Sequence, residues 1–391
     1  MSRKTLLLVN GHMRIGGGEK SLLDLLQHLD YTQYNVDFLL IEGKGDYYSQ
    51  IPSNVNIVFV DTTKAYGAFW STITKCIKQK EFFALWFRFV ILTAKLFGKK
   101  TLYLLTPILH LKSKYDCAIA YRPGPCADIV AYAVKANKKI CWWHHGEICY
   151  NKSQTDSINI TWHHFSNIVT VSNGCRLMLE NHFTSCAGKT IVIPNMIDVD
   201  EITTMAGSIN PYSNTSSKTI IVTVGRLSPE KHIENVAYSA KQMIDSGFNN
   251  FIWYIIGDGQ QRNNIQETID TLGVESYVIL LGNKSNPYPY IKFADLLVHT
   301  SYVESQCITV LEAMALKTPC IVTRSLGPSE FMEDGVNGIV VDPNKDSLKD
   351  GITRMLNHKN QHKESLLDNA YKVVINKYSP ETIIKEVKKI L

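Results

Sequence analysis

Two stretches of this chain repeat one pattern, in which short runs of Val, Ile and Leu alternate with longer runs whose apolar residues recur every three or four positions. The short runs are typical of buried strands and the longer ones of amphipathic helices, so their alternation predicts parallel sheets covered by helices. The strand-like runs are 6–9, 36–41, 55–60, 117–121, 140–143, 168–171 and 191–193, then 219–224, 251–256, 277–281, 296–299 and 319–323. Residues 206–218, rich in Gly, Pro, Asn and Ser, interrupt the pattern.

The restart after this break indicates two domains, which is also what a length of 391 residues favours. We expect an α/β protein with two doubly wound, Rossmann-like domains that face each other across a ligand-binding cleft, because ligands bind beyond the carboxyl ends of such strands. The expected domains are 1–200 and 201–376, with a helix over 377–391 that returns to the first domain. A hydrophobic content of 45% is enough for two cores and excludes a disordered chain.

Composition also bears on location. The first apolar run, 5–9, is too short for a signal-peptide core or a membrane span. The nine cysteines are scattered and contain no C-x-x-C pair, which is typical of reduced thiols. We therefore expect a cytoplasmic protein.

A run of glycines lies in the loop after the first strand. The segment Gly16-Gly17-Gly18-Glu19 lies between that strand and the first helix, where backbone N–H groups and a helix N-terminus can bind an anion. It matches neither the dinucleotide nor the Walker phosphate-binding motif, so a simple tight turn is an equal alternative.

Two cations follow the first strand of the second half. Arg226 and Lys231 flank the turn 227–230, a spacing that suits a diphosphate, although two solvated surface charges are the alternative without further support.

Two glutamates, Glu304 and Glu312, follow the strand at 296–299. On one continuous helix they would be about 12 Å apart along the axis, too far for an acid/base pair of the glycosidase type. We expect Glu304 in the loop before a helix, with the N–H groups of Ser305, Gln306, Cys307 and Ile308 opening that helix toward an anion. Glu312 then lies two turns inside it.

These elements together resemble glycosyltransferase family 4, especially in bacterial capsule and cell-envelope polysaccharide enzymes. The resemblance rests on E-x(7)-E with its continuation 311–315, on 224–231, Ile193-Pro-Asn-Met-Ile-Asp198, Ile256-Gly-Asp-Gly259 and Gly335-Val-Asn-Gly338. It is strong over 190–342 and weaker before that, through 16–19 and 143–147. It implies the two-domain GT-B fold and a retaining transfer of sugar from a nucleoside diphosphate, with a UDP-sugar as donor.

The resemblance also implies roles for individual residues. Arg226 and Lys231 would bind the donor diphosphate, Glu304 the sugar and Glu312 the ribose. Gly257 would lie at the donor, the backbone of Gly282 and Asn283 at the base, and Gly16 to Gly18 at the phosphates from the opposite domain. His145 would lie at the reacting face of the sugar, with His144 as the competing assignment and Glu147 and Glu19 on the acceptor side.

The residue types fit this chemistry without a cofactor. A departing diphosphate needs its growing negative charge stabilised, which two cations and a helix N-terminus can do. We expect no metal, because no convergent cluster of His, Asp and Glu residues is apparent and the spacing of Cys141, His144, His145 and Cys149 is not a zinc framework. Packing in the core is the alternative for the two histidines.

Four positions depart from the family. Cys307, His232 and Lys317 stand where relatives commonly have glycine, and Gln306 replaces an aromatic residue and is expected to face the cleft and read the sugar.

The segment 72–115 carries nine Lys or Arg residues against one acid, Glu81, among many aromatic residues. Helical periodicity would align Arg88, Lys95 and Lys99 in one basic stripe, which indicates an interfacial helix on anionic lipid. A core helix with snorkelling cations is the alternative. A nucleic-acid partner is not expected, because no recognition module is present.

From the residues and the resemblance together we expect a glycosyltransferase that extends a glycan or lipid-linked saccharide at the cytoplasmic face of the cell membrane. A nucleotide-sugar epimerase of the same fold is the alternative, and it would need no acceptor. A non-enzymatic sugar-nucleotide-binding subunit is a second one, which the presence of both glutamates and both cations disfavours.

Overall fold

The computed structural model describes residues 3–65, 69–213, 217–357 and 360–391, and these form two compact units. Unit 1 comprises Met1–Ile193 with Ile384–Leu391, and unit 2 comprises Pro194–Ile383. The division lies a few residues before the expected boundary at 200/201. Within unit 1 the last residues contact the first strand, where Lys4 Nζ donates to the carbonyl of Leu391 at 3.3 Å.

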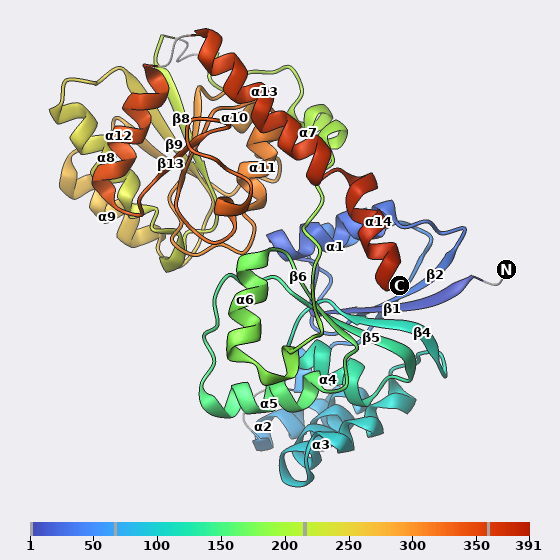
Figure 1. Ribbon diagram of the computed structural model, residues 1–391. Coiled ribbons are helices and arrows are strands. Elements are labelled where there is room, and N and C mark those ends of the chain that lie inside the picture. The colour runs from blue at the N-terminus through green and yellow to red at the C-terminus, as the bar shows by residue number, and fades with distance from the viewer. Residues whose placement is uncertain (1–2, 66–68, 214–216, 358–359) are drawn as a thin grey trace. The chain divides into compact units, whose positions relative to one another are not determined.

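Unit 1 contains a seven-stranded parallel sheet in the order β3-β2-β1-β4-β5-β6-β7 (Figure 1). The strands are β1 Lys4–Asn10, β2 Tyr34–Leu40, β3 Val55–Phe59, β4 Tyr115–Ala120, β5 Ala136–Trp143, β6 Asn167–Thr170 and β7 Thr190–Val192. Leu6 to Val9 of the central strand β1 are fully buried, because helices cover both faces of the sheet.

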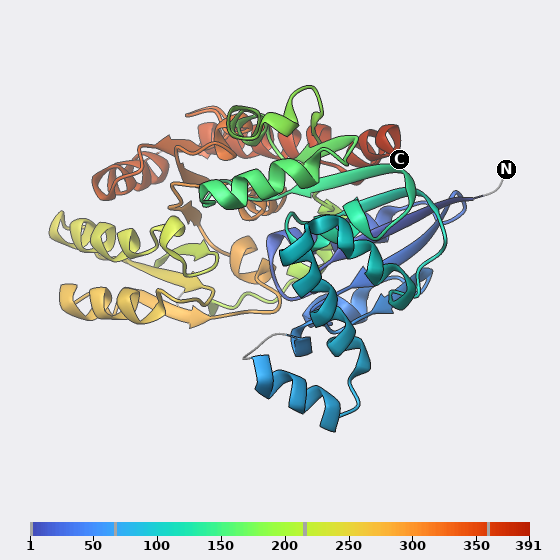
Figure 2. The ribbon, with the colours of Figure 1, turned by 90° about the horizontal axis from the view of Figure 1, so that it is seen from below.

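The helices of unit 1 are α1 Gly17–His28, α2 Phe69–Lys78, α3 Phe82–Phe97, α4 Pro125–Tyr132, α5 Lys152–Trp162 and α6 Asn173–His182, with 3-10 turns η1 Asp46–Gln50, η2 Thr63–Ala65, η3 Lys99–Ile108 and η4 Thr184–Cys186. The leucines of α1 at positions 22, 23, 25 and 26 are buried against the sheet. α2 and α3 lie on the side of the unit away from its strands, and η3 packs between α3 and α4 (Figure 2).

Unit 2 repeats the plan with a six-stranded parallel sheet in the order β10-β9-β8-β11-β12-β13. Its strands are β8 Thr219–Val224, β9 Phe251–Ile256, β10 Val278–Gly282, β11 Leu296–His299, β12 Cys320–Thr323 and β13 Ile339–Val341. Its helices are α7 Val199–Ala206, α8 Glu234–Asp245, α9 Arg262–Leu272, α10 Tyr288–Lys292, α11 Ile308–Ala315, α12 Lys345–Leu356 and α13 Asn360–Lys377, with 3-10 turns η6 Pro229–Lys231 and η7 Pro328–Glu330; α14, Pro380–Ile390, crosses into unit 1.

Helices cover both faces of the unit 2 sheet. α8, α9 and α12 cover one face, while α10, α11 and α13 cover the other (Figure 1). Each strand predicted from the sequence has its counterpart in one of the two sheets. The prediction missed β13, whose three residues are too few for a strand pattern to stand out.

The segment 72–115 differs from its prediction. α3 ends at Phe97, so Lys99 is not on that helix. Its ammonium group turns inward and donates to Asp128 Oδ1 at 2.7 Å and to Thr161 Oγ1 at 2.9 Å. Arg88 also turns inward and donates to the carbonyl of Ala65 at 2.6 Å. The predicted basic stripe of Arg88, Lys95 and Lys99 is therefore wrong, because buried oxygens draw two of its three cations into the fold.

Candidate functional site

The candidate donor-side residues of unit 2 lie where the strands β8 and β11 end. β8 leads into the loop with Arg226 and η6, and β11 leads into the loop with Glu304, just before α11. Because carboxyl ends of neighbouring parallel strands share one sheet edge, two segments about seventy residues apart in sequence become neighbours. As expected, Glu304 precedes the helix. The helix begins only at Ile308, however, so Ser305 to Cys307 belong to the loop and Glu312 lies about one turn inside α11, not two.

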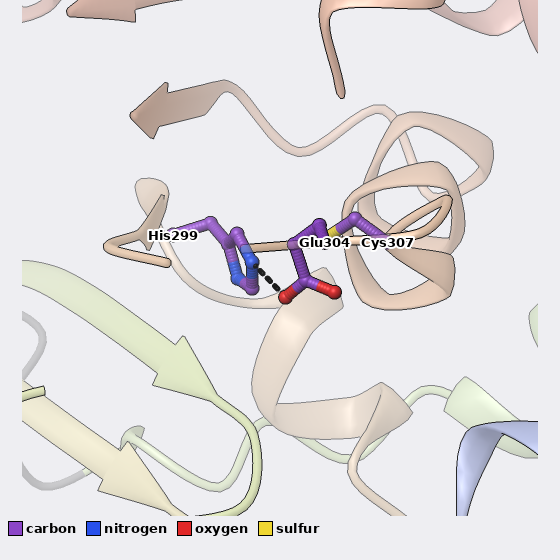
Figure 3. A group of neighbouring side chains, drawn as sticks. All are labelled: His299, Glu304 and Cys307. Atoms are coloured by element: carbon purple, nitrogen blue, oxygen red, sulfur yellow. Dashed lines mark hydrogen bonds and ion pairs between the residues drawn. The ribbon is translucent and has the colours of Figure 1, made fainter. Parts of the chain in front are cut away.

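An ion pair joins the two loops. Glu304 accepts a hydrogen bond from the ammonium group of Lys231, and its same oxygen lies 2.7 Å from Nε2 of His299, the last residue of β11 (Figure 3). All three side chains are largely buried. An ionised carboxylate only accepts hydrogen bonds, so His299 donates through Nε2.

Burial and charge oppose each other at this pair. Burial by itself would raise the pKa of Glu304, but Lys231 and His299 outweigh it and hold that pKa well below its usual range. Burial would lower the pKa of Lys231, and the charge of Glu304 raises it instead. Both groups are therefore ionised at neutral pH, and each compensates the other.

The two cations differ in exposure. The side chain of Arg226 is 74% exposed and forms only a loose pair with Glu230 at 3.4 Å, whereas that of Lys231 is 18% exposed. The alternative of two solvated surface charges is therefore wrong for Lys231. Arg226 is the side chain that can reach a ligand without losing a strong partner.

His232 and Tyr302 fasten the same two loops. Their rings stack with centroids 3.6 Å apart, and the amide of Tyr302 donates to the carbonyl of Glu230 at 3.2 Å. His232, Cys307 and Lys317 have φ values of 45°, 68° and 55°. The positions at which the family commonly has glycine thus keep the left-handed backbone here, although each carries a side chain.

Gln306 does not face a ligand. Its side chain is buried, accepts from the amide of Asn195 at 2.6 Å and donates to the carbonyl of the same residue at 3.1 Å. The expectation that it reads the sugar is therefore wrong: its two amide ends hold the 194–198 segment to the loop before α11. Ser305, beside it, is half-buried.

The remaining predicted donor residues lie in this unit too. Glu312 is buried on α11 and accepts from the hydroxyl of Tyr288 at 2.9 Å. Gly257 has φ of 144°, and a Cβ there would lie 1.8 Å from the carbonyl oxygen of Gly225, so only glycine lets the loops after β8 and β9 meet. Gly282 ends β10 with φ of 69°, and Asn283 after it is exposed.

His299, Glu304 and Cys307 form a group whose ligand-type atoms lie within 4.8 Å of one another (Figure 3). The sequence did not predict this cluster. Lys231 already neutralises Glu304, and burial raises the pKa of the Cys307 thiol, which disfavours the thiolate form that a metal ion would bind. Metal independence stays a prediction.

The predicted residues of unit 1 lie in the loops and helix start that follow β1 and β5, and partners for them come from the residues just after β4. Glu19 is buried, pairs with Arg122 and lies 3.6 Å from Nδ1 of His12. Its carboxylate folds back over the start of α1, where a Cβ on Gly16 would meet it at 2.6 Å. The first turn of α1 thus carries a carboxylate, and Arg122 neutralises its charge. Gly17, also in this turn, is exposed.

The two histidines have separate surroundings. A Cβ on Gly18 would lie 3.7 Å from His144, whose ring packs on Tyr121 with centroids 4.7 Å apart. Both ring nitrogens of His144 are buried and have no hydrogen-bond partner among the described residues. Burial, with His145 and Arg122 nearby, lowers the pKa of His144 to about 3, so its imidazole is neutral. His145 and Glu147 are exposed.

The sequence analysis missed four partners in these sites: His299, Tyr288, Arg122 and Tyr121. Each pairs with or packs on a predicted residue. His299, Tyr121 and Arg122 are at or just past a strand end, a position that could have marked them. Tyr288 opens the short helix α10, and no sequence signal singles it out.

Residues 209–373 match the family model described as glycosyl transferases group 1. Among curated relatives, the uncharacterized glycosyltransferase MJ1607 of Methanocaldococcus jannaschii is 35% identical over 170 residues, which are 43% of each chain. The poly(ribitol-phosphate) alpha-N-acetylglucosaminyltransferase of Staphylococcus aureus is 28% identical over 199 residues, 50% of this chain and 40% of that one. The chain thus spans less than half the length of these relatives.

Solved structures resemble the whole chain. HepE of Anabaena, determined in complex with UDP and glucose, superposes with a TM-score of 0.75 at 17% identity over 99% of both chains. TarM of Staphylococcus aureus superposes with a TM-score of 0.74 at 15% identity over 99% of both. The two Rossmann-like units therefore have the GT-B fold, as the resemblance implied.

Proposed function

We propose that this chain is a retaining glycosyltransferase that moves a sugar from a nucleoside diphosphate, UDP in the first instance, to a saccharide acceptor. The observation that carries the proposal is the pair of loops in unit 2, where Arg226 is exposed and free of a strong partner beside the buried Lys231–Glu304 pair. The match of residues 209–373 to a glycosyltransferase model supports it, and so do the UDP complexes of HepE and TarM.

In this proposal the two cations act on the leaving group. As the bond from the sugar to the diphosphate breaks, negative charge grows on the departing oxygen, and preorganised charges stabilise it without reorganising. Arg226 and Lys231 supply those charges, and the N-terminus of α11 adds its N–H groups. Glu304, held ionised by Lys231 and His299, contacts the sugar, and Glu312 accepts from the ribose hydroxyls.

For unit 1 we propose His144, not His145, as the histidine that faces the reacting sugar. Two observations support this choice: its ring nitrogens have no hydrogen-bond partner within the described parts of the chain, and its ring lies against the glycine loop. A neutral imidazole can donate through one nitrogen and accept through the other, which suits a sugar hydroxyl. Glu147 and Glu19 stay assigned to the acceptor side.

We further propose that the acceptor is a glycan or lipid-linked saccharide of the bacterial cell envelope, reached at the cytoplasmic face of the membrane, with residues 72–115 on an anionic surface. The names of relatives support envelope chemistry, since one acts on poly(ribitol-phosphate) and another is a lipopolysaccharide core glycosyltransferase. A nucleotide-sugar epimerase remains the alternative function.

The donor can be tested with a thermal-shift panel of nucleotide sugars. A donor at one hundred times its Kd stabilises the folded protein by about 2.7 kcal/mol, so UDP-sugars should raise Tm by several degrees and GDP-sugars by less. The matched control is Arg226→Ala, which removes one contact to the bound diphosphate and should reduce the shift. If no nucleotide sugar shifts Tm, the proposal is wrong. Product formed from donor alone, with no acceptor, would favour the epimerase.

Metal independence can be tested in the same transfer assay. Because the charge on the diphosphate is met by Arg226, Lys231 and a helix N-terminus, EDTA should leave more than about half of the activity. Complete loss that magnesium or manganese restores would show that a carboxylate ligand set binds a required ion.

A further inference from the structure

The outer helix α3 has two apolar faces, one buried and the other exposed. One packs on the core through Ala84, Phe87 and Val90, which are buried. The other is apolar as well, yet exposed: Phe82 is 72%, Phe89 52% and Phe97 76% exposed, with Trp86 and Leu96 on the same arc of about 100°. Exposed apolar patches of this kind mark interaction surfaces.

We call this exposed face the aromatic ridge (Phe82, Trp86, Phe89, Leu96 and Phe97), and Trp86 connects it to the neighbouring turn η3. Trp86 lies 5.6 Å from Phe89 between ring centroids, and its indole N–H donates to the carbonyl of Leu104 at 2.9 Å, which ties α3 to η3. Beside it is a hollow of about 560 Å³, lined by Phe82, Trp86, Phe89 and Ile108 among others.

Exposed lysines flank α3 along the chain. Lys78 and Lys80 precede it, Lys95 lies in its last turn and Lys100 follows it. Lys75, Lys112 and Lys114 of the same segment are exposed as well, and Lys112 pairs with Asp37 at 3.3 Å. The one acid of 72–115, Glu81, is neutralised by Lys64 at 2.7 Å. An apolar ridge bordered by cations is complementary to a surface that is apolar inside and anionic outside, as a bilayer with acidic headgroups is.

We propose that the aromatic ridge inserts into the interface of an anionic membrane, with the surrounding lysines on the lipid headgroups. None of the helices in the described parts of the chain is long and apolar enough to span a bilayer, so the contact is interfacial. The contact differs from the predicted basic stripe, because Arg88 and Lys99 face inward and the aromatic rings provide the insertion. The membrane contact itself does not depend on the proposed function. Only its role, which is to bring the site to lipid-linked acceptors, rests on that function.

The test is co-sedimentation of the full chain with phosphatidylglycerol–phosphatidylcholine vesicles and with phosphatidylcholine vesicles, without donor or acceptor. Wild type should bind the anionic vesicles more tightly and keep part of that binding at 1 M salt, where charge attraction is screened and ring burial is not. Phe82→Ser/Phe89→Ser/Phe97→Ser should weaken binding by about a hundredfold at all salt concentrations. Lys78→Gln/Lys95→Gln/Lys100→Gln should weaken it similarly at low salt only.

Matched controls separate these effects from general changes of surface. Ile160→Ser/Leu177→Ser removes similarly exposed apolar side chains from α5 and α6 of the same unit, and Lys372→Gln/Lys377→Gln/Lys385→Gln removes three exposed lysines elsewhere. Both should bind like wild type. All variants alter exposed side chains, and an unchanged Tm checks their folding.

Three results would overturn the proposal. One is absence of wild-type binding to anionic vesicles at low salt, and another is equal binding by the aromatic variant. The third is concentration-dependent self-association in sedimentation velocity that the aromatic variant abolishes, which would assign the ridge to a second copy of the chain. Vesicle binding needs no catalysis, so the two proposals can fail separately. If the protein does not bind vesicles, the proposed glycosyl transfer is unaffected. If the protein binds vesicles but is inactive, the proposal for the aromatic ridge is unaffected.

Discussion

Arg226→Ala is expected to lower kcat/KM by about 10²- to 10³-fold while leaving the protein as stable as wild type. A preorganised charge on a departing group is worth that much, and its loss acts on the transition state. Stability should not change, since the guanidinium is 74% exposed and its pair with Glu230 is loose. Steady-state kinetics with the donor found by thermal shift, alongside a thermal melt, measures both quantities.

Lys231→Ala should lower kcat/KM to a similar extent and also destabilise the fold. Its removal leaves the carboxylate of Glu304 buried with only His299 as its partner, and an uncompensated buried charge costs about 3 to 5 kcal/mol. The double variant Lys231→Ala/Glu304→Gln removes the orphaned charge and should regain much of the stability with no return of activity. Wild-type turnover in both single variants would contradict the diphosphate assignment.

Acid should destabilise the protein through His144. Its pKa is about 3 in the folded state and near 6.5 when unfolded, so below pH 6.5 the unfolded chain binds the extra proton first. The stabilising contribution is complete above pH 6.5 and declines as pH falls, by about 1.4 kcal/mol per unit until the folded pKa is reached. At pH 4.5 the loss approaches about 3 kcal/mol.

The variant that isolates this effect is His144→Phe, which keeps a ring against Tyr121 and cannot be protonated. Urea unfolding between pH 7 and 4.5 should show a flatter decline of the free energy of unfolding for it than for wild type. The control is His163→Gln, an exposed histidine beyond α5, which should keep the wild-type slope. Parallel slopes for wild type and His144→Phe would show that His144 is accessible enough to protonate in the folded state.

The sequence predicted the fold well because parallel sheets leave a strong local trace. A strand buried on both faces is apolar throughout, as Leu6 to Val9 show, and a covering helix has one apolar face, so both elements are visible without knowledge of their neighbours. The same holds for the position of Glu304 before α11, because a strand followed by a helix must have a loop between them.

Which side chains meet within the site was decided by the tertiary structure. Nothing local distinguishes Arg226, which is exposed, from Lys231, which is buried; the difference comes from a glutamate and a histidine about seventy residues away in sequence. Gln306 turned to the backbone of Asn195 for the same reason: a buried amide satisfies its hydrogen bonds with whatever group the fold brings near.

The segment 72–115 shows the same division. The sequence alone shows that this segment has an excess of positive charge and many aromatic residues. Periodicity then placed the cations on one stripe, but carbonyl and carboxylate oxygens of η2 and α4 drew Arg88 and Lys99 inward and left aromatic rings exposed. Helical spacing depends on bonded neighbours and can be read along the chain, whereas the face that turns to solvent depends on packing partners that only the folded chain brings together.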